Sequence, residues 1–251
     1  MRAIQVTARA MSSKSSNQTR GLSSALLAGH DATQVQLMQE KIIVVDENDV
    51  PLRPGTKEEC HVNDGTDNIL LHRAFSVFLF DAKTNKLLLQ KRAASKITFP
   101  SFWANTCCSH PLYEPEEMEE KDHVGVKRAA IRKLGHELGI PQSCLPMTDF
   151  KYMGTIQYLA PGANGWGEHE IDHVLAIQGT VELNPNPNEV DECRWFDEKE
   201  LAEFMASSKL PGGPKVSPWF AKLHDNFLAS WWVKVRAGTL VPSKDTTIHR
   251  L

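Results

Sequence analysis

The chain has 251 residues, of which 41% are hydrophobic and 24% charged, so it is long enough and apolar enough to form one sizeable globular domain. Its formal net charge of -3 excludes the basic excess of a nucleic-acid-binding protein. No apolar run approaches the roughly 18 residues that cross a bilayer, and the odd number of five cysteines argues against a disulfide framework.

The N-terminal residues differ in composition from the rest of the chain. Residues 1–30 contain several basic residues and serines but no acidic residue, which is typical of an organellar transit peptide. A disordered tail explains the same composition equally well. We predict a flexible N-terminal extension over residues 1–33, one domain over residues 34–236 and a C-terminal tail over residues 237–251.

The final tripeptide, His249-Arg250-Leu251, is close to a peroxisomal import signal. Three residues match such a signal easily by chance. The cytoplasm, the peroxisome and, because of the basic N-terminus, the mitochondrion therefore stay open as compartments.

The first part of the domain is predicted to consist of strands. The β-branched run at residues 41–44 is followed by a turn, which indicates a strand. Two further apolar runs, residues 74–80 and 86–92, flank a short polar loop. This pattern predicts a β-hairpin whose strands are largely buried.

A helix is predicted next. Residues 114–122 carry six acidic side chains, and apolar residues then recur at a spacing of four from Val126 to Leu138. Gly139 closes the series as a helix stop. We expect an amphipathic helix with the acidic residues at its start, where they suit the helix dipole.

The last part of the domain is predicted to add strands and a helix. Strands are expected at residues 152–158, 168–178 and 193–196, and a helix from 219 to about 234. One face of that helix carries Phe220, Leu223, Phe227 and Trp231. Strands around a central helix indicate an α/β or α+β protein with a mixed β-sheet, in a single domain.

Two thiols, a hydroxyl and an imidazole occupy consecutive positions from Cys107 to His110. They follow the predicted hairpin and precede the helix, and loops held by rigid elements often carry functional sites. Inert cysteines buried in a turn are the alternative.

A second polar group lies in a predicted strand. Because strand side chains alternate between faces, Glu168 and Glu170 project to one side and His169 to the other. Two carboxylates on one face of a sheet need a cation or a proton unless they face solvent. With His61, His72 and His110 they form a ligand set that suits Zn²⁺ or Mn²⁺ rather than Ca²⁺. A lone histidine is more often structural, and no spacing proves that these residues converge.

Five motifs in register resemble the type I isopentenyl-diphosphate isomerases. They lie at residues 71–80, 96–100, 105–111, 166–172 and 217–219, and the likeness covers roughly residues 34–232. The resemblance implies a Nudix-like fold, with a mixed sheet between helices, and an enzyme of isoprenoid and sterol biosynthesis. Such an enzyme interconverts isopentenyl and dimethylallyl diphosphate by protonation and deprotonation through a tertiary carbocation.

The same resemblance assigns residues to roles. It implies Cys108 and Glu170 as proton-transfer groups, Tyr158 as the partner of Glu170, and Trp219 as the aromatic face that stabilises the cation. It implies that Lys57, Arg92 and Lys96 bind the diphosphate, while Cys107 is a structural neighbour. The implied metal ligands are His61, His72, His110, Glu168 and Glu170, with Glu137 for a Mg²⁺ that also contacts the substrate.

Residues 132–140 resemble a decayed Nudix box in which Glu137 is the glutamate that remains. Lys133 lies near a basic position of the family but is left out of the predicted site, because a lysine lacks the bidentate geometry of an arginine. The predicted ligands are a small prenyl diphosphate, Mg²⁺, and a second Zn²⁺, Mn²⁺ or Mg²⁺ ion, in a monomer or weak dimer. The alternatives are a Nudix diphosphatase and a non-catalytic, metal-stabilised interaction module.

Overall fold

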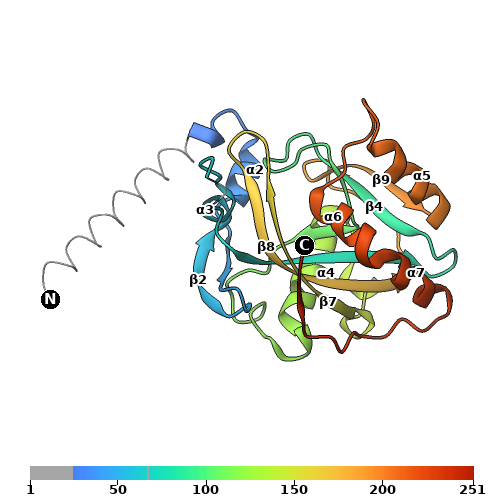
Figure 1. The fold of residues 1–251 in the computed structure, drawn as a ribbon. Helices are drawn as coiled ribbons and strands as arrows, with labels where there is room; N and C mark the ends of the chain where they lie inside the picture. Colours follow the sequence, from blue (N-terminus) through green and yellow to red (C-terminus); the bar gives the residue numbers. More distant parts are fainter. Residues whose placement is uncertain (1–24, 67) are drawn as a thin grey trace, which may run out of the picture.

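The computed structural model describes residues 25–66 and 68–251, so most of the predicted N-terminal extension, including its transit-peptide-like composition, lies outside the described residues. The described strands form one mixed sheet whose main path runs in the order β10-β7-β8-β3-β1-β2 (Figure 1). At its centre β3 (His72–Asp81) and β8 (Gly167–Gly179) pair in parallel along their length. The strand β7 (Lys151–Pro161) lies antiparallel on the other side of β8.

Both ends of this path are short strands. The hairpin of β1 (Lys41–Val45) and β2 (Pro51–Thr56) forms one edge, which confirms the strand predicted at residues 41–44. At the other edge β10 (Ile248–Arg250) runs parallel to β7. The last residues of the predicted C-terminal tail therefore extend the sheet, and the Leu251 amide still donates to the carbonyl of Gln157 at 2.9 Å.

The hairpin predicted from residues 74–92 forms only at its closed end. The strand β4 (Leu87–Arg92) pairs with β3 at the single position Phe80↔Leu87 and then with β9 (Val190–Phe196) and β5 (Trp103–Ala104). The edge of β3 that a longer hairpin needs is occupied by β6 (Cys107–Ser109). This exchange of partners places Cys108 of β6 beside the central strand β3.

One face of the sheet is covered by α4 (Val124–Leu138), which confirms the predicted central helix and its stop at Gly139 (φ 66°). Apolar residues of α4, such as Leu134, pack against the odd-numbered residues of β3 and β8. Contrary to our prediction, the acidic residues are not at the start of α4, whose first turn contains no acidic side chain. They lie in turns and in η1 (Lys121–His123), and left-handed backbone at Asp122 and His123 separates them from the helix.

Helices near the C-terminus cover the opposite face. They are α5 (Glu198–Ser208), α6 (Pro218–Leu223), the π-turn η4 (His224–Leu228) and α7 (Ala229–Arg236). The last three are continuous and correspond to the helix predicted from residue 219. Their apolar residues pack on the even-numbered residues of β3 and β8, so the sheet lies between two helical layers.

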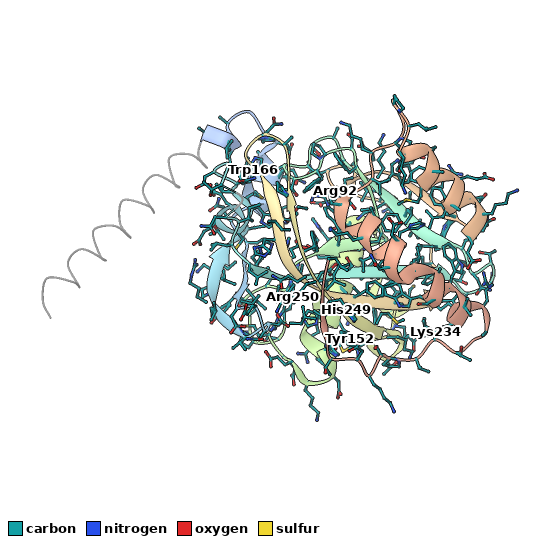
Figure 2. All side chains as sticks on the ribbon, viewed as in Figure 1. Arg92, Tyr152, Trp166, Lys234, His249 and Arg250 are labelled. Carbon is teal, nitrogen blue, oxygen red and sulfur yellow. The ribbon has the colours of Figure 1, made fainter. Side chains whose placement is uncertain are left out.

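The remaining helical elements are short: α2 (Ala32–Leu37) and α3 (Lys57–His61) before β3, and η2 (Gln142–Cys144) and η3 (Met147–Asp149) before β7. Figure 2 shows the side chains on this ribbon, with Arg92 at the end of β4. Within the described ranges no helix is long and apolar enough to span a membrane.

Candidate active site and metal centre

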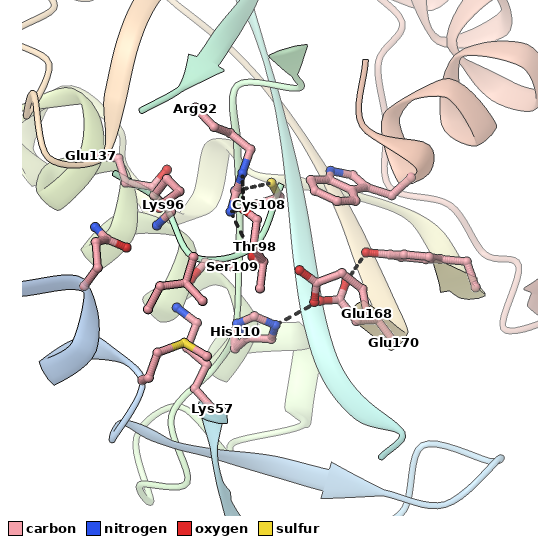
Figure 3. Close-up of a pocket in the computed structure, with 15 residues that line it drawn as sticks. Lys57, Arg92, Lys96, Thr98, Cys108, Ser109, His110, Glu137, Glu168 and Glu170 are labelled. Carbon is pink, nitrogen blue, oxygen red and sulfur yellow. Dashed lines mark hydrogen bonds and ion pairs between the residues drawn. The ribbon is translucent and has the colours of Figure 1, made fainter. Parts of the chain in front are cut away.

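A pocket opens where the C-terminal ends of β4 and β6 and the first residues of β8 approach α2, α3 and α6 (Figure 3). It brings together the predicted site residues other than His61 and His72, which are fully buried behind it. The predicted residues that line it are Lys57, Arg92, Lys96, Cys108, His110, Glu137, Tyr158, Glu168, Glu170 and Trp219. Residues separated by more than 160 positions in the sequence thus share one pocket.

The predicted His/Glu ligands form a compact buried cluster. Each of His61, His72, His110, Glu168 and Glu170 offers one ligand atom, and these atoms lie within 4.8 Å of one another. The parallel register of the sheet contributes directly, because His72 at the start of β3 pairs with Glu170 on β8. The helix α3 ends at His61, and His110 follows β6.

The backbone fixes how two of the imidazoles face the cluster. The Nδ1 atom of His61 lies 2.6 Å from the carbonyl of Lys57, and the Nδ1 atom of His72 lies 2.7 Å from that of Leu70. A carbonyl only accepts, so each Nδ1 carries the proton and each Nε2 offers its lone pair to the cluster. The second ring nitrogen is therefore the ligand atom in both.

The Nε2 atoms meet the two carboxylates at short range. The Nε2 of His61 lies 2.7 Å from Glu168, and that of His110 lies 2.9 Å from Glu170 and 3.2 Å from the Nε2 of His72. Three imidazole nitrogens and two buried carboxylates directed at one point are costly without a counter-charge. The residues fit a divalent cation, whose usual nitrogen and oxygen ligands they are.

A thiol and a carboxylate share the pocket. On β6, Cys108 pairs with Ser76 of β3, and its Sγ lies 4.0 Å from a guanidinium nitrogen of Arg92. The Glu170 carboxylate accepts a hydrogen bond from the Tyr158 hydroxyl. Both Cys108 and Glu170 line the pocket, so a sulfur and a carboxylate border the same space.

The protonation states of these groups differ. Burial raises the pKa of Cys108 to about 12, although the nearby Arg92 opposes the effect. Burial also works against ionisation of Glu170, but the neighbouring His72 imidazole and the hydrogen bond from Tyr158 hold its pKa below the ordinary value. Burial and the Glu170 charge raise the pKa of Tyr158 well above normal. At neutral pH a protonated thiol and an ionised carboxylate thus face the same pocket.

The indole of Trp219 forms an aromatic wall. Its ring lies 6.2 Å from that of Tyr158 and meets Phe99 edge-on at 5.3 Å. Its Nε1 donates to Asn105 at 3.1 Å, which fixes the orientation of the ring. The first turn of α6, with Pro218 at its start, places this indole over the pocket.

Cations and carboxylates lie together where β4, the loop after it and α3 border the pocket. The guanidinium of Arg92 donates to the carbonyl of Thr98 at 2.8 Å. The Lys96 ammonium contacts Glu189 at 2.5 Å, and burial lowers the pKa of Lys57, as does the charge of Lys133. This part of the pocket is suited to a ligand with several negative charges.

Glu137, the glutamate retained in the decayed Nudix box, lies beside these cations. Its carboxylate contacts Lys133 at 3.2 Å and accepts hydrogen bonds from Gln90 at 3.0 Å and from the Cys107 thiol at 3.5 Å. Burial opposes its ionisation, but Lys133 keeps its pKa below the ordinary value. It is therefore an anchored, ionised carboxylate at the edge of the pocket.

Sequence reasoning missed several residues of this part of the pocket. Lys133, which was left out of the predicted site, is fully buried beside Glu137 and does not belong to the described lining residues of the pocket. No sequence signal marks Glu189 as a site residue, because it follows an Asn/Pro run that is typical of a surface loop. Gln34 and Met38 line the pocket from the N-terminal side, where no motif marks them.

Comparison with known proteins agrees with this architecture. A model of the NUDIX domain matches residues 70–220. The crystal structure of a Deinococcus radiodurans protein shares the fold, with a TM-score of 0.51 at 15% identity over 75% of this chain and 99% of that one. Fold and family match define a Nudix-domain protein.

Curated relatives narrow the class. The isopentenyl-diphosphate delta-isomerase of Schizosaccharomyces pombe is 48% identical over 88% of this chain and 95% of its own. The enzyme of Bos taurus is 47% identical over 88% of this chain and 96% of its own. A chloroplastic enzyme from Cannabis sativa is 47% identical over 89% of this chain and 79% of its own. The chain belongs to the isopentenyl-diphosphate delta-isomerase family.

Proposed function

We propose that the protein interconverts isopentenyl diphosphate and dimethylallyl diphosphate by moving a carbon–carbon double bond by one position. The observation that carries the proposal is the pocket that Cys108 and Glu170 share with the cations Lys57, Arg92 and Lys96. The family membership supports the same reaction.

The reaction needs two proton-transfer groups. One proton is added to the terminal carbon of the alkene, which leaves a tertiary carbocation, and another is removed from the carbon on its far side. Cys108 and Glu170 are the proposed pair, and each acts as acid in one direction and as base in the other. The Tyr158 hydroxyl orients the Glu170 carboxylate through its hydrogen bond.

The carbocation must be kept from water and stabilised. The indole of Trp219, which is 3% exposed, presents an aromatic face that can stabilise a cation by about 2 kcal/mol when desolvated. Its fixed orientation through Asn105 means that the face need not reorganise during the reaction. Exclusion of water prevents capture of the cation as an alcohol.

The cationic part of the pocket is the proposed diphosphate site, with Lys57, Arg92 and Lys96 as ligands. Glu137 is the proposed protein ligand of a Mg²⁺ ion, since one anchored carboxylate plus phosphate oxygens is a common Mg²⁺ environment. We place a second divalent ion, Zn²⁺, Mn²⁺ or Mg²⁺, among the five His/Glu ligands. These ions supply positive charge for the diphosphate and for the buried carboxylates when they are bound.

The experiment is incubation with isopentenyl diphosphate and Mg²⁺ in D₂O. Deuterium in the carbon skeleton supports the isomerase, whereas release of phosphate alone indicates a diphosphatase. If neither product is found, the protein is a non-catalytic module. Cys108→Ala should abolish the exchange and keep the metal content. The exposed Cys144, changed to alanine, is the matched control and should exchange like the unchanged protein. Retained exchange in Cys108→Ala contradicts the proposal.

The compartment and the oligomeric state stay predictions. A fluorescent fusion, with and without residues 1–10 or the last three residues, distinguishes cytoplasm, peroxisome and mitochondrion. Sedimentation distinguishes a monomer from a weak dimer.

A further inference from the structure

We propose that Glu189 is a positioning residue of the diphosphate site, which holds the Lys96 ammonium toward the pocket without touching the substrate itself. The inference rests on the proposed function, in which Lys96 binds the diphosphate. It adds to that function a residue from the loop before β9, outside the motifs that carry the family resemblance.

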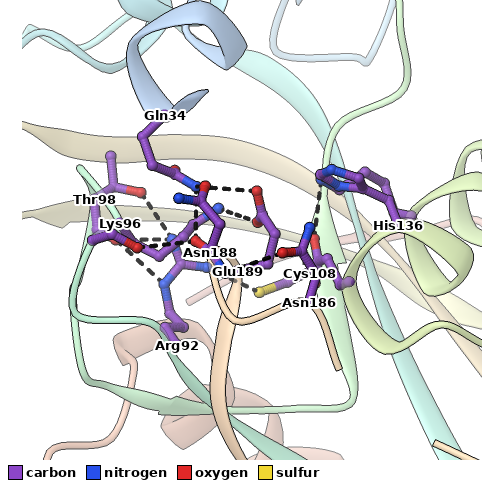
Figure 4. A network of polar contacts seen from close by, with 12 residues as sticks. Gln34, Arg92, Lys96, Thr98, Cys108, His136, Asn186, Asn188 and Glu189 are labelled. Atoms are coloured by element: carbon purple, nitrogen blue, oxygen red, sulfur yellow. Dashed lines mark hydrogen bonds and ion pairs between the residues drawn. The ribbon is translucent and has the colours of Figure 1, made fainter. Parts of the chain in front are cut away.

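The two side chains form a buried ion pair. The Lys96 ammonium lies 2.5 Å from Oε2 of Glu189, and the side chains are 10% and 1% exposed (Figure 4). Lys96 lines the pocket, whereas Glu189 does not belong to the described lining residues. An ammonium has three donors. One donor is used by Glu189, so the other two can serve an anionic ligand.

Glu189 is itself held from both sides. Its second carboxylate oxygen, Oε1, accepts from the Gln34 amide of α2 at 3.1 Å. Its backbone carbonyl accepts from the Ala93 amide at 3.0 Å, and its own amide donates to Asn186 at 2.9 Å. The carboxylate therefore has a fixed position before any ligand arrives.

The same Gln34 amide fixes the neighbouring loop. It donates to the carbonyl of Asn188 at 2.9 Å and to its side-chain oxygen at 2.7 Å. The hydroxyl of Ser95, next to Lys96 in the chain, donates to that carbonyl at 3.0 Å. Together with the Ala93–Glu189 hydrogen bond and the Lys96–Glu189 ion pair, this contact joins the loop that carries Glu189 to the loop that carries Lys96.

The charge distribution explains why Lys96 needs this partner. Burial lowers the pKa of Lys96 to about 8, and the charges of Arg92, Lys57 and Lys133 add to the effect, while Glu189 opposes it. Lys133 has its own carboxylate, Glu137, at 3.2 Å. Glu189 is the corresponding carboxylate for Lys96, and without it the ammonium is repelled by three cations and moves away from the pocket.

The test is a double-mutant cycle of Glu189→Gln and Lys96→Met, with two measurements. One is kcat and KM for isopentenyl diphosphate, and the other is calorimetric binding of inorganic pyrophosphate with Mg²⁺. Glu189→Gln should raise both KM and the pyrophosphate Kd about tenfold and leave kcat within about twofold, since an interaction with the non-reacting end is lost. In the Lys96→Met background the same change should have no further effect.

Two other variants complete the design. Glu189→Asp keeps the charge, and the flexible lysine can follow the shorter carboxylate, so at least half of the lost affinity should return. Glu203→Gln removes an exposed carboxylate on α5, with 69% side-chain exposure, and should change nothing. If Glu189→Gln folds poorly, Glu189→Asp and the double variant still give the comparison.

The inference is overturned if Glu189→Gln leaves the pyrophosphate Kd unchanged, or changes it equally in both backgrounds. Pyrophosphate binding does not require isomerisation. A Kd that depends on Glu189 together with no deuterium label therefore overturns the proposed function alone, and a label together with an unchanged Kd overturns the role of Glu189 alone.

Discussion

The two ends of the central strand pair β3–β8 differ in what they bury. At one end, His72 and Glu170 pair across the strands and belong to the His/Glu cluster. Near the other end, Phe78 pairs with Ala176, and the phenyl ring packs against Phe220 and Trp231. Both ends are almost fully buried, although one contains charged groups and the other apolar ones.

The difference indicates that one strand pair carries the candidate site at one end and part of the apolar core at the other. Burial of the ionisable end disfavours folding unless cations and hydrogen bonds compensate it. The apolar end supplies the hydrophobic free energy that allows this. Substitutions at the ligand end should therefore change activity more than stability, and substitutions at the apolar end should do the reverse.

The largest expected effect is on activity, from Glu170→Gln at the ligand end. In the proposed reaction Glu170 accepts the substrate proton, which an amide cannot do, so kcat should fall about 10⁴-fold. The Tyr158 hydroxyl can still donate to the amide oxygen, so the fold should persist. Turnover is measured with isopentenyl diphosphate, and near-normal turnover would show that this carboxylate is not the proton-transfer group.

The next effect is on stability, from Phe78→Ala at the apolar end. Removal of this fully buried ring leaves a cavity beside Phe220 and Trp231 and should cost about 3–5 kcal/mol in the free energy of unfolding. Denaturant titration measures the loss. The metal content and the turnover per folded molecule should stay within about twofold, and loss of the metal would break the proposed separation of the two ends.

Chelation should have an intermediate effect. If the ion is present at about 100 times its Kd, binding contributes about 2.7 kcal/mol, so treatment with EDTA should lower Tm by about 5–10 °C. Addition of Zn²⁺, Mn²⁺ or Mg²⁺ one at a time identifies the ion that restores it. The variant Glu168→Gln should respond less to the chelator, and equal Tm values with and without EDTA would contradict a metal in the cluster.

The smallest effect concerns a titratable group at the start of α4. The ring of His123 stacks on Tyr152 with the centroids 3.8 Å apart, and burial lowers its pKa to about 4, with a further contribution from His173. The folded-state pKa lies below the unfolded value, so the stabilisation is present above about pH 6.5 and is lost as the pH falls toward 4. The other charged groups that act on this ring are Lys127, Asp122 and Asp49.

His123→Asn tests this pH dependence and keeps a residue that tolerates the left-handed backbone (φ 56°). Because the ring is half-exposed and screened by solvent, the stability lost by the unchanged protein between pH 7 and 4.5 should exceed that of the variant by only about 1 kcal/mol. Denaturant titration at both pH values gives the difference. Equal losses would show that the ring titrates normally.

Local patterns predicted the long elements well. The buried run of β3 and the spacing of apolar residues in α4 are strong signals, and both elements were confirmed. The short strands β5 and β6 have two and three residues, too few for a periodicity. The helix α5 was missed despite the capping box of Asp197 and Glu200, a signal that was present in the sequence.

The site was predicted in residue type but not in geometry. Ligand chemistry selected the histidines and glutamates, yet their convergence depends on the parallel register of His72 with Glu170, 98 positions later in the chain. Nothing local specifies that register. Glu189 could not be predicted for a similar reason, because its proposed role depends on an ion pair with Lys96, which lies in a different loop.

The number of residues in the π-turn η4, rather than their identity, sets the orientation of the helix α7 that follows it. A π-turn holds one residue more than an α-helical turn, so it shifts the angular position of everything that follows by about 100°. With that shift, Trp219 before the π-turn and Trp231 after it both face the sheet. Deletion of a single residue within 224–228 would restore regular helix and keep α7 in its packing, whereas conversion of this turn to regular helix at unchanged length would rotate α7 by about 100°.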